Sequence, residues 1–152
     1  MNIPRVVLDT NVWLDWLVFD DHSMYYLQSE LNAGKIEIII NEACKDEFVR
    51  VLYYPRLGLS EEEIFEKRHR MDMNCSIRIG PSSNPNASIP VCRDPDDQKF
   101  LQLACESGAS WLLSRDKALL ALNKKVKHRS LMILTPDCWR VKCSNQSNSQ
   151  HL

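Results

Sequence analysis

The chain has 152 residues, of which 44% are hydrophobic and 26% are charged, the composition of one ordinary soluble globular domain. At this length folding buries about 70% of the surface of the unfolded chain, so neither disulfides nor a structural metal are needed to form a core. No apolar run approaches the ~20 residues of a membrane span, which argues against a membrane protein.

The cysteine and histidine patterns favour a reducing environment and disfavour a zinc site. The six cysteines contain no CxxC pair, and the four histidines show no ligand spacing such as HxxxH. We therefore expect reduced thiols in a cytoplasmic protein and no zinc.

The formal net charge is −1, but the charges are unevenly distributed along the chain. Residues 1–110 carry 11 Lys and Arg against 18 Asp and Glu, a balance of −7. Residues 111–152 carry 8 against 2, a balance of +6. Nucleic-acid binding depends largely on basic surface, so the near-neutral total argues against such a partner only if the charges intermix in space.

Short apolar runs alternate with helical patterns along the chain. Five apolar runs predict strands: residues 5–8, 36–40, 76–79, 111–114 and 131–134. Apolar periodicity and capping residues predict helices between them: residues 23–33, 42–54, 60–71, 94–107 and 116–122. Ser60 with Glu63 matches a capping box, and Asp94 before Pro95 matches a helix N-cap. A Pro-rich stretch, residues 80–93, is expected to be a loop.

This alternation predicts a three-layer α/β/α sandwich with a mainly parallel, Rossmann-like central sheet. In such sheets ligands bind beyond the carboxyl ends of the strands, at the point where the strand order reverses. We expect one domain over residues 1–142 and a polar, disordered tail over residues 143–152.

Acidic residues fall close to the expected ends of strands. Asp9 ends the first strand, and Asp116 lies two residues beyond the strand 111–114. Asp94, Asp96 and Asp97 open the helix before that strand, and Glu47 lies in a helix next to the second strand, so that all six could converge on one edge of the sheet. A cluster of carboxylates stays ionised only with compensating positive charge, and hard oxygen ligands suit Mg²⁺ or Mn²⁺. The pattern therefore indicates metal-assisted phosphodiester hydrolysis.

Most of these acids also have a purely structural interpretation. Asp94 and Asp116 could cap the helices that follow them, whereas Asp96, Asp97 and Glu47 could be solvated helix residues. Asp9 is harder to explain, because an acid that closes a buried strand near the expected switch point has no obvious structural task.

The chain resembles the PIN domain (PilT N-terminus) nucleases, in the branch of toxins of toxin–antitoxin systems. VVLDTNVWLDWLV resembles the opening strand of that family, with Asp9 at its first acid and Asn11 as the polar companion. EFVRVLYYPRLGLS, which begins at Glu47, is similar to its second acidic helix.

The block CRDPDDQKFLQLACESGASWLLSRDKALL resembles the most diagnostic part of the family. It places Asp97 at the third acid, Ser114 where the family has Thr or Ser, and Asp116 at the fourth acid. LMILTPDCW resembles the closing strand and its Thr-Pro turn.

The resemblance implies a PIN-like fold and a metal-dependent endoribonuclease. By it, Asp9, Glu47, Asp97 and Asp116 are catalytic and bind Mg²⁺ or Mn²⁺, with Asp94 and Asp96 as further candidate ligands. It also implies RNA as substrate, a small antitoxin protein as partner, and a homodimer or larger homo-oligomer.

Two other features could contact RNA, and each has a structural alternative. Basic residues follow the last acid and could hold phosphates, or could form a solvated loop: Arg115, Lys117, Lys124, Lys125, Lys127 and Arg129. Trp13 and Trp16 could stack on bases or pack against the next helix.

Two alternatives to a ribonuclease stay open at this point. A haloacid-dehalogenase-like phosphatase would need a second acid at position 11, where this chain has Asn11. A catalytically silent PIN-fold module that binds RNA or protein would not need the acids, so their intact set argues against it without excluding it.

Overall fold

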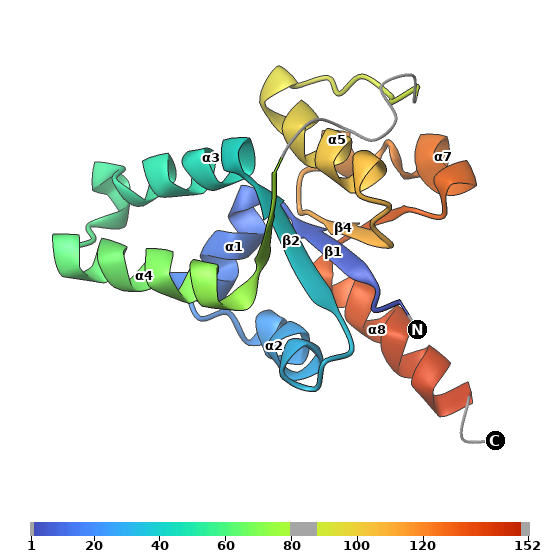
Figure 1. Ribbon diagram of the computed structural model, residues 1–152, viewed down its shortest axis with the longest axis horizontal. Coiled ribbons are helices and arrows are strands. Elements are labelled where there is room, and N and C mark those ends of the chain that lie inside the picture. The colour runs from blue at the N-terminus through green and yellow to red at the C-terminus, as the bar shows by residue number, and fades with distance from the viewer. Residues whose placement is uncertain (1, 80–87, 150–152) are drawn as a thin grey trace.

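A computed structural model describes residues 2–79 and 88–149 of the chain (Figure 1). Five parallel strands form its sheet, in the order β3-β2-β1-β4-β5. They are β1 (Arg5–Leu8), β2 (Glu37–Asn41), β3 (Ser76–Arg78), β4 (Trp111–Leu113) and β5 (Met132–Leu134). The five predicted strands are therefore all present.

Helices cover both faces of the sheet, as the three-layer prediction requires. The α-helices are α1 (Thr10–Leu17), α2 (Tyr25–Asn32), α3 (Glu42–Leu52), α4 (Glu61–Asn74), α5 (Gln98–Glu106), α6 (Lys117–Leu120), α7 (Asn123–Val126) and α8 (Pro136–Ser149). Short 3₁₀ turns are η1 (His22–Met24), η2 (Pro55–Leu57), η3 (Pro95–Asp97) and η4 (Lys127–Arg129). Figure 1 shows α5 and α7 above the sheet and α2 and α8 below it. The predicted α/β/α sandwich is confirmed.

The central strands are buried on both faces, which explains their continuous apolar runs. Residues 6–8 of β1, 38–40 of β2 and 112–113 of β4 are at most 1% exposed. In the parallel register Val7 lies opposite Ile39 on one side and Leu112 on the other. β-Branched and leucine side chains therefore meet on both faces of the sheet, as is typical of parallel sheets between helical layers.

The helix starts follow the capping residues that the sequence predicts. The Ser60 hydroxyl accepts the Glu63 N–H at 3.1 Å while the Glu63 carboxylate accepts the Ser60 N–H at 3.0 Å. This reciprocal pair is the capping box, and it fixes the start of α4. Asp94 accepts the Asp96 N–H at 2.9 Å and caps η3, as expected of an acid before proline.

Helix α1 was not among the predicted helices. Most of it is buried, including Val12, Trp13 and Leu17, so its sequence shows little of the apolar and polar alternation that marks a surface helix. Its first residue directly follows Asp9, with which the Trp13 N–H makes a backbone bond of 3.1 Å.

The C-terminal segment differs from the predicted tail. Thr135 accepts the Cys138 N–H at 3.1 Å and starts α8, which continues through the expected domain end at residue 142 as far as Ser149. Contacts of α8 with α2 and β5 hold it, and Trp139 is 1% exposed among Trp111 and Tyr26. Residues 150–152 of that segment, and residues 80–87 of the predicted loop, lie outside the described residues.

No helix among the described residues combines the length and apolarity that crossing a membrane requires.

Candidate metal centre

The switch point of the sheet lies between β1 and β4. The chain leaves β1 toward β2 and β3 on one side, and reaches β4 and β5 on the other. The Asp9 N–H donates to the Leu113 carbonyl at 3.0 Å, so the residues that follow β1 and β4 start side by side. Ligands of parallel α/β sheets bind in the crevice at this point.

A chain of hydrogen bonds joins Asp9, Ser114 and Asp116 at the switch point. The Ser114 hydroxyl donates to Oδ2 of Asp9 at 2.7 Å and accepts the Asp116 N–H at 3.0 Å. Asp116 in turn accepts the Leu119 N–H on Oδ1 at 3.0 Å, which caps α6. Ser114 is fully buried and Asp9 is 4% exposed. Asp116 thus has two roles: Oδ1 of its carboxylate caps α6, and its N–H is linked to Asp9 through the Ser114 hydroxyl. Oδ2 of Asp116 is not used by the cap.

Glu47 approaches from α3, and its carboxylate is held on both oxygens. The Thr10 hydroxyl donates to Oε2, and Lys99 Nζ lies 2.8 Å from Oε1. Arg50 lies farther off, with Nη2 4.0 Å from Oε1. The Glu47 side chain is 14% exposed, so this half-buried acid has its own cation.

Asp97 is the acid whose carboxylate lacks a protein partner. Oδ2 of Asp97 is buried and accepts no hydrogen bond from the described residues. Burial, followed by the negative charges of Asp9, Asp116, Asp94 and Glu47, raises the pKa of Asp97 to about 7. The acids of four separate segments are therefore close enough to affect one another electrostatically.

Burial and neighbouring negative charges also raise the pKa of Asp9, although two hydrogen bonds lower it. Burial raises the pKa of Asp9 above its usual range, and the charges of Glu47 and Asp116 add to that effect. The hydrogen bonds from the Ser114 hydroxyl and the Thr10 N–H act in the opposite direction, because they stabilise the ionised carboxylate.

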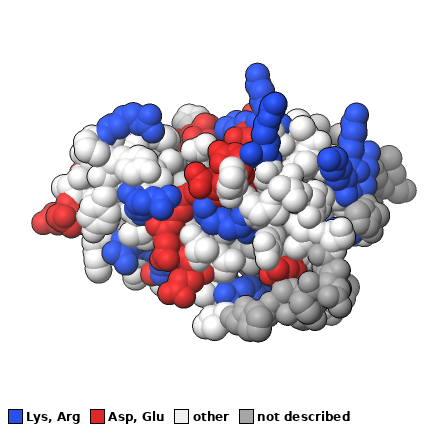
Figure 2. Space-filling model, turned by 90° about the horizontal axis from the view of Figure 1, so that it is seen from above, with Lys and Arg blue, Asp and Glu red and all other residues white. Residues whose placement is uncertain are grey.

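Acidic side chains are concentrated on one part of the face that Figure 2 shows. They gather in a band near the middle of the face, with Lys and Arg side chains on both sides of the band. The −1 total charge of the chain thus conceals an acidic centre with basic borders, the arrangement in which a neutral total does not argue against nucleic acid.

The donor set fits a divalent cation with oxygen ligands. An unpartnered carboxylate oxygen on Asp97, beside the carboxylates of Asp9 and Asp116, leaves negative charge that a cation would neutralise. Within the described residues no group of three or more His, Cys, Asp or Glu side chains is arranged so that all of them could hold one metal ion. Mg²⁺ does not require such a group, because it keeps several waters and binds through one or two carboxylates.

Comparison with known proteins identifies the family. A family model described as "PIN domain" matches residues 5–118, a range that includes all six candidate acids. The chain belongs to the PIN-domain family. It is also 41% identical over 137 residues to "Uncharacterized protein MJ1680" of Methanocaldococcus jannaschii, an alignment that covers 87% of this chain and 85% of that protein.

The other predicted site residues of this PIN domain have different places. Asp94 lies close enough to raise the pKa of Asp97, although its own carboxylate caps η3. Asp96 is exposed, and its backbone carbonyl accepts a hydrogen bond from Lys99 at 2.8 Å. Asn11 is exposed on α1, whereas Ser114 is the buried polar support of Asp9.

Of the predicted basic residues, two arginines have protein partners and four lysines have no ion pair within the described residues. Arg115 is bound by Asp15, with Nε 2.7 Å from Oδ2, and it also donates to Ser23 at 3.0 Å. Arg129 donates to the Ser88 carbonyl. Four lysines are exposed and have no ion pair within the described part of the chain: Lys117, Lys124, Lys125 and Lys127.

Trp13 and Trp16 adopt the packing alternative. Trp13 is 1% and Trp16 is 4% exposed, and their rings stack with centroids 5.3 Å apart. Trp16 Nε1 donates to Gln28 at 3.0 Å. Neither ring face is open to a base.

Two contacts of the site were not predicted from sequence. Thr10 and Lys99 both bind Glu47, although neither is acidic and neither matched the pattern used to find candidates. Both residues could have been proposed from the sequence because they lie next to candidate acids: Thr10 follows Asp9, and Lys99 comes two residues after Asp97.

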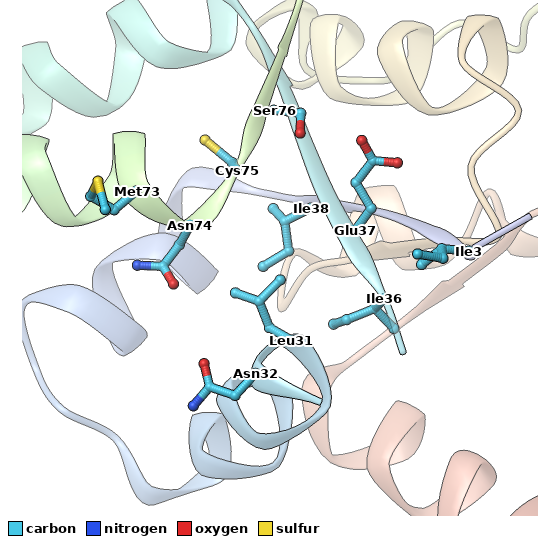
Figure 3. A pocket seen from close by; sticks show the side chains of 10 residues that line it. All are labelled: Ile3, Leu31, Asn32, Ile36, Glu37, Ile38, Met73, Asn74, Cys75 and Ser76. Atoms are coloured by element: carbon cyan, nitrogen blue, oxygen red, sulfur yellow. The ribbon is translucent and has the colours of Figure 1, made fainter. Parts of the chain in front are cut away.

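A hollow of about 580 Å³ lies at the opposite, amino-terminal edge of the sheet (Figure 3). Leu31, Ile36 and Ile38 supply much of its apolar lining, and its one acid, Glu37, has an Arg5 partner at 3.7 Å. It holds no converging carboxylates, so it is separate from the candidate metal centre.

Proposed function

We propose that this PIN domain is a metal-dependent endoribonuclease that hydrolyses phosphodiester bonds in RNA. The observation that carries the proposal is Oδ2 of Asp97, a buried oxygen without a partner among the described residues, on a carboxylate whose pKa four other nearby acids raise. Family membership supports hydrolysis, since PIN domains are generally nuclease-like hydrolases.

The contacts of each acidic residue indicate its role in the proposed reaction. Asp9, Asp97 and Asp116 would hold Mg²⁺ or Mn²⁺, and Ser114 fixes the Asp9 carboxylate by its hydrogen bond. Glu47 adds negative charge from α3. When bound, the ion acidifies a water and neutralises charge that develops on the phosphoryl oxygens.

Exposed lysines would hold the phosphates on either side of the scissile bond. Lys117 follows Asp116 directly, and Lys124, Lys125 and Lys127 extend the basic border through α7 and η4. Such contacts make binding strongly dependent on salt, because each neutralised phosphate releases counterions. Binding that is independent of salt would contradict this part of the proposal.

The deciding experiment is cleavage of labelled RNA in Mg²⁺, Mn²⁺ or EDTA. We expect cleavage with either metal, none in EDTA, and a loss of at least about 100-fold in Asp9→Asn and Asp97→Asn, the size typical of losing a charge-stabilising group. Asp46→Asn is the matched control, since Asp46 is an exposed acid of α3 next to Glu47.

Persistence of cleavage in EDTA, or in both site variants, would contradict the metal-dependent mechanism. Binding of RNA without cleavage in any metal would favour the alternative of a catalytically silent binding module. The phosphatase alternative predicts release of phosphate from a monoester, which the same preparations can test.

We also propose that the protein is a cytoplasmic toxin of a toxin–antitoxin pair and forms a homodimer or larger assembly. The test is expression of the chain in bacteria, with and without the product of the adjacent gene. Growth arrest that requires Asp97 and is relieved by that product supports the role, and unaffected growth contradicts it. Light scattering of the purified chain gives its oligomeric state.

A further inference from the structure

Lys99 is a fixed cation inside the acidic centre. Its Nζ lies 2.8 Å from Oε1 of Glu47, donates to the Asp96 carbonyl at 2.8 Å, and is 5.4 Å from the centroid of the Phe100 ring. The Lys99 side chain is 24% exposed, far less than a solvated surface lysine. Three partners on one ammonium group hold it in a single place.

The position of Lys99 affects whether the Glu47 carboxylate is free to bind a metal ion. Oε1 of Glu47 is bound by Lys99, and Oε2 accepts the Thr10 hydroxyl, so both oxygens are already engaged. To ligate an ion directly, Glu47 would have to give up a charge-assisted contact in a half-buried place, where such contacts are strong. Oδ2 of Asp97 has no partner in the described part of the chain, and the partners of the Asp9 and Asp116 carboxylates are neutral hydrogen-bond donors, whereas Glu47 is paired with a cation.

We propose that Lys99 is a positioning residue that holds Glu47 out of direct metal coordination and limits the centre to one divalent ion. Its ammonium supplies, on the Glu47 side, the positive charge that a second ion would otherwise bring. The inference rests on the proposed function, because it presumes that the centre binds a divalent ion at all.

A second ion pair of the same kind provides the matched control. Lys45, on the same helix as Glu47, lies with Nζ 2.6 Å from Oδ1 of Asp72, and its side chain is 23% exposed. The distance and the burial of the lysine are close to those of Lys99 with Glu47, although Asp72 is 47% exposed against 14% for Glu47. Neither Lys45 nor Asp72 is among the main causes of the raised pKa values of Asp9 and Asp97. Loss of this pair should therefore alter stability without altering metal binding.

The test counts bound Mn²⁺ by electron paramagnetic resonance of the free ion, without any RNA. We expect one ion in the wild type, in Lys99→Arg and in Lys45→Met, and a second ion in Lys99→Met. Two ions in the wild type, or one ion with unchanged affinity in Lys99→Met, would overturn the inference alone. No bound ion in the wild type would overturn the proposed function and the inference with it.

Glu47→Gln supplies a second readout that does not depend on how well Lys99→Met folds. Because Glu47 is not a direct ligand in this inference, its loss should weaken Mn²⁺ binding by no more than about 10-fold, the low end for residues that only support ligands. Asp97→Asn should weaken binding by at least about 100-fold. Equal losses in the two variants would show that Glu47 ligates the ion and would overturn the assignment of Lys99.

Discussion

The Ser114 hydroxyl lies 2.7 Å from Oδ2 of Asp9, although the two residues are 105 positions apart in the chain. The bond crosses the switch point of the sheet, from the end of β4 to the end of β1. Both residues are buried, so the hydroxyl replaces water as the partner of the carboxylate and opposes the increase in the pKa of Asp9 that burial causes.

Removal of this hydroxyl should affect stability and metal binding together. Ser114→Ala leaves a buried carboxylate oxygen and the Asp116 N–H without their partner, which should cost about 1–3 kcal/mol of unfolding free energy. Loss of the orienting bond should also weaken Mn²⁺ binding by about 10–100-fold. Urea unfolding and a Mn²⁺ titration measure the two effects.

Ser29→Ala is the control for Ser114→Ala, because Ser29 is exposed on α2 and distant in sequence from the site. Its effect on stability should stay within about 0.5 kcal/mol, as is usual for surface substitutions. If the two variants have the same stability and the same Mn²⁺ affinity, the Ser114 hydroxyl does not support Asp9.

The metal-free protein should lose stability as the pH rises from 5 to 8. The pKa of Asp97 is about 7 in the fold, against about 3.9 in an unfolded chain. The folded state therefore holds this proton more tightly, so its contribution to stability is full below about pH 4 and is lost as the pH rises through about 7. The raised pKa of Asp9 acts in the same direction.

Thermal unfolding in EDTA at pH 5 and pH 8 measures this loss. Asp97→Asn removes the titrating group, so the Tm of the variant should fall less than that of the wild type between the two pH values. Mg²⁺ should raise the Tm of the wild type more at pH 8 than at pH 5, because the ionised acids bind it. Identical pH dependence of wild type and variant would exclude Asp97 as the source.

The strand pattern and the acids were predictable because both depend on local sequence. Continuous apolar runs predict buried parallel strands, and acids at their ends must then meet at one edge. Asp9 and Asp116 could be placed together in this way, since Asp9 directly follows β1 and Asp116 comes three residues after the end of the neighbouring strand β4.

Side-chain partners that depend on tertiary placement could not be predicted. Lys99 lies on a helix that packs near Glu47, and no local sequence pattern predicts that packing. From the sequence alone Lys99 is indistinguishable from an ordinary surface lysine. Arg115 was one candidate for contact with RNA, with a solvated loop as the alternative, but it is bound by Asp15 of the unpredicted helix α1 and by Ser23 of the turn η1.

RNA binding should depend on the exposed lysines and not on Arg115. In an Asp9→Asn background, which binds without cleaving, Lys124→Gln with Lys125→Gln should lower the slope of log affinity against log salt by about 1.4, since each contact to single-stranded RNA contributes about 0.7. Arg115→Gln should reduce stability through its lost ion pair and leave the slope unchanged.

A double substitution of two other exposed lysines controls for total charge. Lys35 follows α2 at the amino-terminal edge of the sheet, and Lys142 lies on α8. Lys35→Gln with Lys142→Gln removes the same charge but should leave the salt slope within error of the parent. Equal slopes for both double variants would mean that α7 does not contact the RNA.

Trp13 should matter for folding and not for RNA. It is 1% exposed, stacks on Trp16 at 5.3 Å, and has the Phe48 ring 6.1 Å away, so no base can reach its face. Trp13→Ala should cost about 3–5 kcal/mol of unfolding free energy, as for other large side chains removed from a core. Trp13→Phe keeps most of the ring and should fold well enough for an RNA titration with unchanged affinity.

Tyr53 is the comparison for Trp13, since it is an aromatic side chain that is 50% exposed at the end of α3. Tyr53→Ala should change the unfolding free energy by no more than about 0.5 kcal/mol. A 10-fold loss of RNA affinity in a folded Trp13→Phe protein would contradict the packing role, because a buried ring has no means of contacting the ligand directly. Unchanged affinity with lowered stability would confirm that Trp13 packs α1 against Phe48 of α3 and has no contact with RNA.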